Sequence, residues 1–111
     1  MARADRIDLL QGTLGLLVLK ALEDGLRHGY QIARTIERNT DDVLRVEEGS
    51  LYPALHRMQQ RKWIKASWGV SENNRRAKFY ELTALGRKQL AKEADEWGRY
   101  ANAVARMLES G

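Results

Sequence analysis

The sequence of 111 residues contains no cysteine, a single proline and no long uninterrupted apolar run. The absence of cysteine excludes a disulfide framework, a thiolate nucleophile and a cysteine-based zinc site, and it suits a reducing compartment. Asp5, Arg6, Asp8 and Lys20 interrupt the first apolar segment, which lacks a signal-peptide core and falls short of the roughly 18 to 20 apolar residues of a membrane span. We expect a cytoplasmic protein with no membrane segment.

What the chain does contain is typical of a small globular protein. Hydrophobic residues make up 43% of it and charged residues 31%, whereas disordered chains combine low hydrophobicity with high net charge. A chain of this length suffices for one domain with one modest core. The formal net charge of +4 and the isoelectric point near 9.6 favour acidic partners, such as nucleic acid or an anionic membrane surface.

Helical periodicity in the first half predicts two helices. The first has an apolar stripe that runs from Ile7 and ends near Asp24-Gly25: Ile7, Leu10, Leu14, Leu17, Val18, Ala21 and Leu22. The second follows His28-Gly29, with these residues inward: Tyr30, Ile32, Ala33 and Ile36. The β-branched run 43–46 is either a short strand or an extended connection.

The single proline, Pro53, predicts where a third helix starts. Ser50 is a good N-cap residue, which would put Pro53 at the third helical position, where a proline is harmless because first-turn amides have no partner within the helix. The inward face would be formed by Leu51, Ala54, Leu55 and Met58. An outward stripe at helical spacing would present Pro53, His56, Arg57 and Gln60.

A basic β-hairpin and a long helix are predicted to complete the chain. Segments 63–68 and 77–82 are rich in aromatic and β-branched residues and read as strands joined by the polar segment 69–76. Residues 61–78 carry six basic side chains and one acid, Glu72, so their net charge is +5. Thr83 would cap the last helix, whose apolar residues alternate four and three positions apart, as in a coiled-coil seam: Leu90, Ala94, Trp97, Ala101, Val104 and Leu108.

This order of elements predicts a mainly α fold with a small β-hairpin, arranged as a winged helix-turn-helix. We expect residues 1–83 to form the DNA-binding domain and residues 84–109 to form a dimerisation helix. In such a fold the recognition helix enters the major groove of a duplex, and neighbouring lysines and arginines neutralise phosphates. The predicted dimer interface combines the seam of the last helix with Leu10 and Leu14 of the first, and it makes the protein a homodimer.

Four segments together resemble the PadR-like family of transcriptional regulators. They are 12-GTLGLLVLKAL-22, 28-HGYQIA-33, 49-GSLYPALHRM-58 and 75-RRAKFYELTALGRKQL-90. The resemblance implies a cytoplasmic, dimeric DNA-binding regulator, usually a repressor, in which SLYPAL opens the recognition helix and NNRRAK forms the wing. The sequence departs from the family pattern at Lys62, which stands where a glycine is usual and makes the local turn the least predictable part.

The predicted DNA contacts lie on the second helix, the third helix and the wing. They are Tyr30, Ser50, Tyr52, Pro53, His56, Arg57, Asn74, Arg75, Arg76 and Lys78. For Tyr30 and Tyr52, packing within the protein is an equal alternative to a phosphate contact, and Asn74 also suits a turn. Trp97 is either a seam residue or the floor of a pocket for a small aromatic or hydrophobic effector.

The residue inventory bears on three classes of function. An enzyme is disfavoured, because the only imidazole bases are His28 and His56 and no phosphate-binding loop or metal-ligand spacing is present, so no cofactor or metal is expected. The favoured function is a sequence-specific repressor that binds a palindromic site on double-stranded DNA. The alternative is a non-enzymatic interaction module that uses the basic wing and the last helix to bind an acidic partner.

Overall fold

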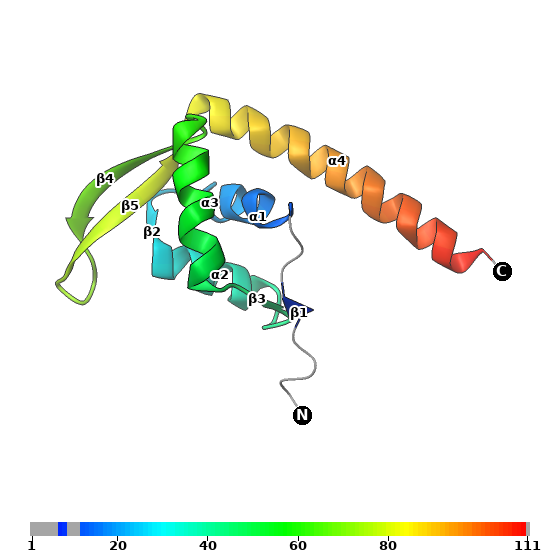
Figure 1. Ribbon diagram of the computed structural model, residues 1–111, viewed down its shortest axis with the longest axis horizontal. Coiled ribbons are helices and arrows are strands. Elements are labelled where there is room, and N and C mark those ends of the chain that lie inside the picture. Colours follow the sequence, from blue (N-terminus) through cyan, green and yellow to red (C-terminus); the bar gives the residue numbers. More distant parts are fainter. Residues whose placement is uncertain (1–6, 9–11, 111) are drawn as a thin grey trace.

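The computed structural model describes residues 7–8 and 12–110, which form four helices and five strands. The helices are α1 (Leu14–Ala21), α2 (Gly29–Asn39), α3 (Glu48–Gln60) and α4 (Ala84–Glu109). The strands are β1 (Ile7–Asp8), β2 (Arg27–His28), β3 (Leu44–Arg45), β4 (Ile64–Val70) and β5 (Arg76–Leu82). In Figure 1, α1, α2 and α3 gather beside the β4–β5 hairpin, while α4 leads away from them to the C-terminus.

The start predicted for the first helix is wrong. Ile7 and Asp8 are extended and pair in parallel with Leu44 and Arg45, which also settles residues 44–45 as a strand. Helix α1 begins only at Leu14, after Gly12, whose φ of +97° lies in the left-handed region that a right-handed helix cannot include. The apolar spacing thus continues across a backbone break that periodicity does not detect. Leu10 lies outside the described residues.

The core lies where α1, α2 and α3 meet one face of the sheet. Its fully buried side chains are Val18, Leu19, Leu22, Ile32, Leu51, Leu55 and Ile64. The inward face predicted for the third helix is confirmed, since its four apolar residues are all buried. The inward position predicted for Tyr30 is wrong: its side chain is 66% exposed, because it follows the helix start directly and Ile32 takes the buried position.

Helix α3 starts earlier than predicted. Its N-cap is Glu47, so Ser50 lies within the first turn and provides no side-chain cap, and Pro53 lies inside the helix. The cost of an internal proline is limited here, because the carbonyl without a helical partner belongs to Gly49, which is exposed and can bond water. Glu48 in the first turn favours this earlier start through its interaction with the helix dipole.

The C-terminus of α3 shows why a glycine would suit the position of Lys62. Lys62 has a φ of +65°, and its amide donates to the carbonyl of Gln59 while the amide of Trp63 donates to that of Met58. This pair of bonds is the Schellman motif, which requires a left-handed residue after the C-cap. Lys62 therefore keeps the geometry of a glycine turn at some cost in backbone strain.

The predicted hairpin is confirmed, with longer strands than expected. β4 and β5 pair antiparallel from Ile64–Leu82 to Val70–Arg76. A short third strand that the sequence does not predict, β2, joins the other side of β5, where His28 pairs with Phe79. The sheet order is therefore β2-β5-β4, and β2 brings the start of α2 next to the hairpin.

A junction of backbone contacts fixes α3 and α4 to one another. The Thr83 hydroxyl caps α4 by accepting from the amide of Gly86 at 3.0 Å, as predicted, and it also donates to the carbonyl of Lys62 at 2.6 Å. The amide of Thr83 donates to the carbonyl of Trp63. A Cβ atom added to Gly86 would overlap that same carbonyl oxygen, so glycine is required for this close approach.

Beyond the junction, α4 leaves the core. Leu90 is buried in the core of its own chain, which leaves little of its side chain for the predicted dimer interface. Farther along, the large apolar side chains are exposed: Trp97, Tyr100, Val104, Met107 and Leu108. Within the described residues no helix is long and apolar enough to cross a membrane.

Candidate nucleic-acid interface

Helix α3 presents a polar and basic face away from the core. Pro53, His56, Arg57 and Gln60 are all exposed, as the helical spacing predicted, and Tyr52 and Ser50 are exposed as well. These side chains supply hydroxyl, imidazole and guanidinium donors together with the apolar proline ring. Such a set is suited to the edges of bases in a major groove, where donors, acceptors and thymine methyl groups are displayed.

The turn of the hairpin, residues 71–75, is built by Ser71 and Asn74. The Ser71 amide donates to the Arg75 carbonyl at 2.8 Å, and the Ser71 hydroxyl accepts from the Arg75 amide at 3.3 Å. Asn74 adopts a φ of +59°, which asparagine tolerates better than most residues. Asn74 thus has the turn-building role that was one of its two predicted roles, while its contact with DNA stays a prediction.

One face of the hairpin continues the surface of α3. Residues of β4 that share the side of buried Ile64 include Trp68 and Val70, and their partners on β5 are Lys78 and Arg76. The Arg76 guanidinium lies 4.3 Å from the centre of the exposed Trp68 ring, and the Lys78 ammonium lies 6.0 Å from that of Tyr80. The hairpin therefore carries cations interleaved with aromatic rings, a combination that suits a nucleic-acid backbone.

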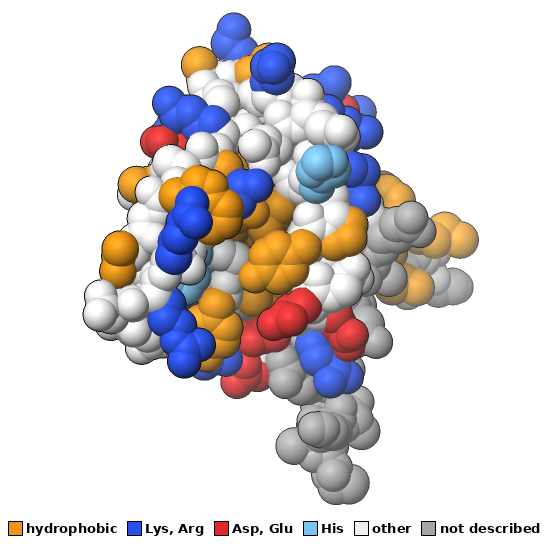
Figure 2. Space-filling model, turned by 60° about the vertical axis from the view of Figure 1, so that its left-hand side comes forward, with side chains coloured by type: hydrophobic (Ala, Val, Ile, Leu, Met, Phe, Trp, Pro, Cys, Tyr) orange, Lys and Arg blue, Asp and Glu red, His pale blue; other side chains and the backbone are white. Residues whose placement is uncertain are grey.

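Tyr52 joins this face to α3 and to the start of α2. A Cβ atom on Gly29 would overlap the Tyr52 hydroxyl, so the ring packs directly on the α2 backbone. Burial raises the pKa of Tyr80, and the nearby Tyr52 raises it further. Tyr52 therefore packs within the protein, which was one of its two predicted roles, and it is still 46% exposed, while its contact with a phosphate stays a prediction. Figure 2 shows Lys and Arg side chains around exposed hydrophobic ones on one face of the molecule.

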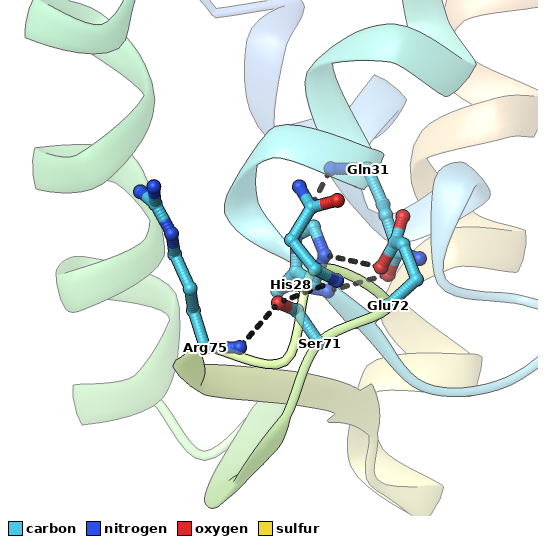
Figure 3. A network of polar contacts seen from close by, with 6 residues as sticks. His28, Gln31, Ser71, Glu72 and Arg75 are labelled. Carbon is cyan, nitrogen blue, oxygen red and sulfur yellow. Dashed lines mark hydrogen bonds and ion pairs between the residues drawn. The ribbon is translucent and has the colours of Figure 1, made fainter.

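The same region contains a polar network centred on His28, shown in Figure 3. The buried His28 ring caps α2 by accepting from the Gln31 amide through Nδ1, while its own amide donates to the Gln31 side chain at 3.0 Å. Because Nδ1 accepts, the ring proton is on Nε2, which donates to Glu72 Oε1 at 3.3 Å. Bonds from the backbone amide of Glu72 and from His28 hold the pKa of the Glu72 carboxyl below its usual range.

Sequence reasoning missed three residues of this region. Trp68 was placed in a strand but not in the interface, although its parity with Ile64 puts it on the same side of the hairpin. His28 and Glu72 were not paired, since 44 positions separate them in the chain. Of the described residues, no three His, Asp or Glu side chains are close enough together to hold a metal ion.

The predicted effector position lies in a shallow groove. Trp97 and Tyr100, with ring centres 5.8 Å apart, line it from α4, and Thr13 and Leu16 line it from the start of α1. Its volume is about 330 Å³, and the charged side chains Lys92, Glu93 and Glu96 complete its wall. A groove that combines aromatic and charged walls is compatible with a small aromatic ligand, but an effector at Trp97 stays a prediction.

The fold and this surface define a winged helix-turn-helix protein, with α3 in the position of the recognition helix and the β4–β5 hairpin as the wing. The sequence pattern of the transcriptional regulator PadR-like family matches residues 18–92, more than half of the chain, so the protein belongs to this family.

Solved structures agree with this assignment. A PadR-like transcriptional regulator from Bacillus cereus is 28% identical with a TM-score of 0.77, over 92% of this chain and 97% of the other. A transcriptional regulator from Clostridium thermocellum is 26% identical with a TM-score of 0.80, over 89% and 96% of the two chains. By sequence alone, the chain is also similar to an uncharacterized protein X of Lysinibacillus sphaericus, with 26% identity over 94% of this chain and 95% of the other. The protein is a transcriptional regulator of the winged-helix type.

Proposed function

We propose that the protein acts as a dimeric repressor that binds a palindromic operator on double-stranded DNA. The observation that carries the proposal is the continuous surface formed by the exposed face of α3 and the cationic, aromatic face of the wing. A surface of this kind matches the major groove and its two flanking phosphate chains. Binding over a promoter would exclude RNA polymerase, and the site of action would be the cytoplasm, where such DNA lies.

Within this surface, base readout and phosphate contact fall to different residues. Arg57, exposed on α3, is the candidate for a bidentate bond to a guanine, and the ring of Pro53 is suited to a thymine methyl group. The hydroxyls of Tyr30 and Tyr52 and the cations of Arg75, Arg76 and Lys78 are assigned to phosphates. His56, Ser50 and Asn74 complete the predicted contact set.

The dimer in this proposal uses the apolar stripe of α4. Trp97, Val104 and Leu108 are exposed in the single chain, together with half-buried Ala101 and exposed Ala94. A helix that shows such a stripe to water is stabilised when a second copy covers it. Leu14, which is also predicted for this interface, lies half-buried against the core at the start of α1. Residues 84–109 would then act as the dimerisation helix and residues 1–83 as the DNA-binding domain.

The test is selection of duplexes from a random pool at about physiological salt. The expected result is an enriched inverted repeat with half-sites about one helical turn apart, or a multiple of it. Binding that follows salt concentration alone, without enrichment, would contradict the repressor and favour the non-enzymatic interaction module. An enriched site also supplies the probe with which small aromatic effectors are screened for release of DNA.

A further inference from the structure

The wing contains one acidic residue in a position where acid is unexpected. Glu72 is the single acid of residues 61–78, and it lies in the turn next to Arg75 and Arg76. A carboxylate on a surface that meets phosphates costs affinity, because like charges repel. The side-chain hydrogen bond that the structure records for Glu72 leads away from these arginines, to His28 at the start of α2.

Three contacts fix the orientation of the His28 ring. Its backbone pairs with Phe79 of β5, its Nδ1 caps α2, and its ring meets the Phe79 ring edge-on at a centroid distance of 5.3 Å. The side chain is 10% exposed. With the ring fixed, Nε2 points to one place only, which the Glu72 carboxylate occupies.

The wing turn, in contrast, has few other attachments. Its internal bonds join Ser71 to residues 73–75, and the ladder of β4 and β5 ends at the Val70–Arg76 pair. A contact that fixes Glu72 therefore fixes the whole turn relative to α2, including the backbone from which the Arg75 side chain extends. In Figure 3 this side chain points away from the network.

We infer that the His28–Glu72 contact is a latch that positions the wing for DNA, so that Glu72 strengthens binding although its charge repels phosphates. This inference rests on the proposed function. His28 and Glu72 act as positioning residues, because they act on the duplex through the placement of Arg75 and Arg76.

Two substitutions with the same charge separate the latch from simple repulsion. Glu72→Gln and Glu72→Ala both remove the negative charge, but only glutamine keeps an oxygen that can accept from His28 Nε2. With the operator from the selection experiment, Glu72→Ala is expected to bind about two- to fivefold more weakly than Glu72→Gln, which is the lower part of the range of a single net hydrogen bond. Equal affinities, or tighter binding by Glu72→Ala, would overturn the inference.

A substitution at the other partner tests the pairing. His28→Asn retains a preferred N-cap side chain for α2 but is too short to reach Glu72. It is expected to weaken operator binding as Glu72→Ala does. The double variant with both His28→Asn and Glu72→Ala should bind no more weakly than either single variant. Additive losses would show that the two residues act independently and would overturn the latch. Equal thermal unfolding midpoints of the Glu72 variants confirm that folding is not the cause.

A measurement without DNA keeps this inference separate from the proposed function. Because the chain has no cysteine, spin labels can be placed at Asn73→Cys in the turn and Arg38→Cys on α2, with single-label samples to identify distances between protomers. The distance distribution is expected to broaden with Glu72→Ala and to stay narrow with Glu72→Gln. Identical distributions would overturn the latch. Failure to select any operator would instead refute the proposed function, and the distances would still test the latch.

Discussion

Helices α3 and α4 meet at one junction, where α3 ends and α4 begins, and they turn opposite kinds of surface outward. The outward face of α3 carries hydroxyl, imidazole and guanidinium groups, whereas the exposed side of α4 beyond Leu90 carries tryptophan, tyrosine, valine, methionine and leucine. Amphipathicity alone does not distinguish them, because each helix also has an inward apolar side. The chemistry of the exposed side is what separates a surface for a polyanion from a surface for another apolar helix.

The most severe way to break this arrangement is to disturb the junction itself. Gly86→Ala places a Cβ atom on the carbonyl of Trp63, so the backbone that connects α3 to α4 must shift. We expect the free energy of unfolding to fall by about 3 kcal/mol or more, measured by denaturant titration. Gly98→Ala is the matched control in the same helix, where a Cβ atom meets nothing within 4 Å of the single chain. It should stabilise the helix by about 0.5 to 1 kcal/mol.

The apolar side of α4 is tested by one buried charge. Val104→Asp would place a carboxylate in the proposed seam and should cost the dimer about 2 kcal/mol or more. Sedimentation should show monomers at concentrations where the wild type is dimeric, with an unchanged circular dichroism spectrum. Asn102→Asp, on an exposed position of the same turn, adds the same charge and should leave the dimer intact. Equal behaviour of the two variants would remove Val104 from the interface.

The polar side of α3 is tested at Arg57. Replacement by alanine should cost about 1 to 3 kcal/mol on the selected operator and much less on random duplex, because a bond to a base can form only where that base is present. Titration of both duplexes by fluorescence anisotropy measures the difference. Equal costs on the two duplexes would make Arg57 a phosphate contact.

Substitutions in the wing sharpen the comparison further. Alanine at both Arg75 and Arg76 should weaken binding to every duplex and reduce the slope of log affinity against log salt by about 0.9 for each phosphate that is no longer neutralised. An unchanged slope would show that the wing does not touch the backbone. Affinities over a series of salt concentrations supply the slope.

The smallest expected effect lies at the end of α3. Lys62→Gly removes the strain of a left-handed residue with a side chain and should stabilise the fold by about 0.5 to 1 kcal/mol, seen as a rise in the thermal midpoint. Lys62→Ala removes the same charge but keeps the strain, so it should not stabilise. If both variants raise the midpoint equally, charge rather than backbone conformation is the cause.

Residues whose environment depends on their own helix or strand were predictable. The buried face of α3, the hairpin and the Thr83 cap follow from spacing and capping chemistry, and each is confirmed. The spacing of apolar residues gave the wrong helix start where the backbone conformation interrupts the helix, as at Gly12. It also did so where two residues could each cap the same helix, as Ser50 and Glu47 could for α3. Apolar spacing does not separate core from interface, so it did not reveal that Leu90 is buried within its own chain.

The site divides in the same way. Exposure of the α3 residues and of Arg75 and Arg76 followed from the helical and hairpin pattern. The pairing of His28 with Glu72 could not be predicted, because it depends on β2 joining the sheet, and a two-residue strand has no detectable period. Contacts between distant segments therefore account for most of what the sequence did not reveal.

The rigid junction of Lys62, Trp63, Thr83 and Gly86 makes α4 a lever. The helix has 26 residues and is about 39 Å long. A tilt of about 10° at one end therefore displaces the other by about 7 Å, which approaches the rise of two base pairs. Because the junction connects α4 directly to the end of α3, a small change in the angle between the α4 helices of two copies would change the distance between their α3 helices. Leverage of this kind would let a slight repacking near Trp97 move a half-site out of register.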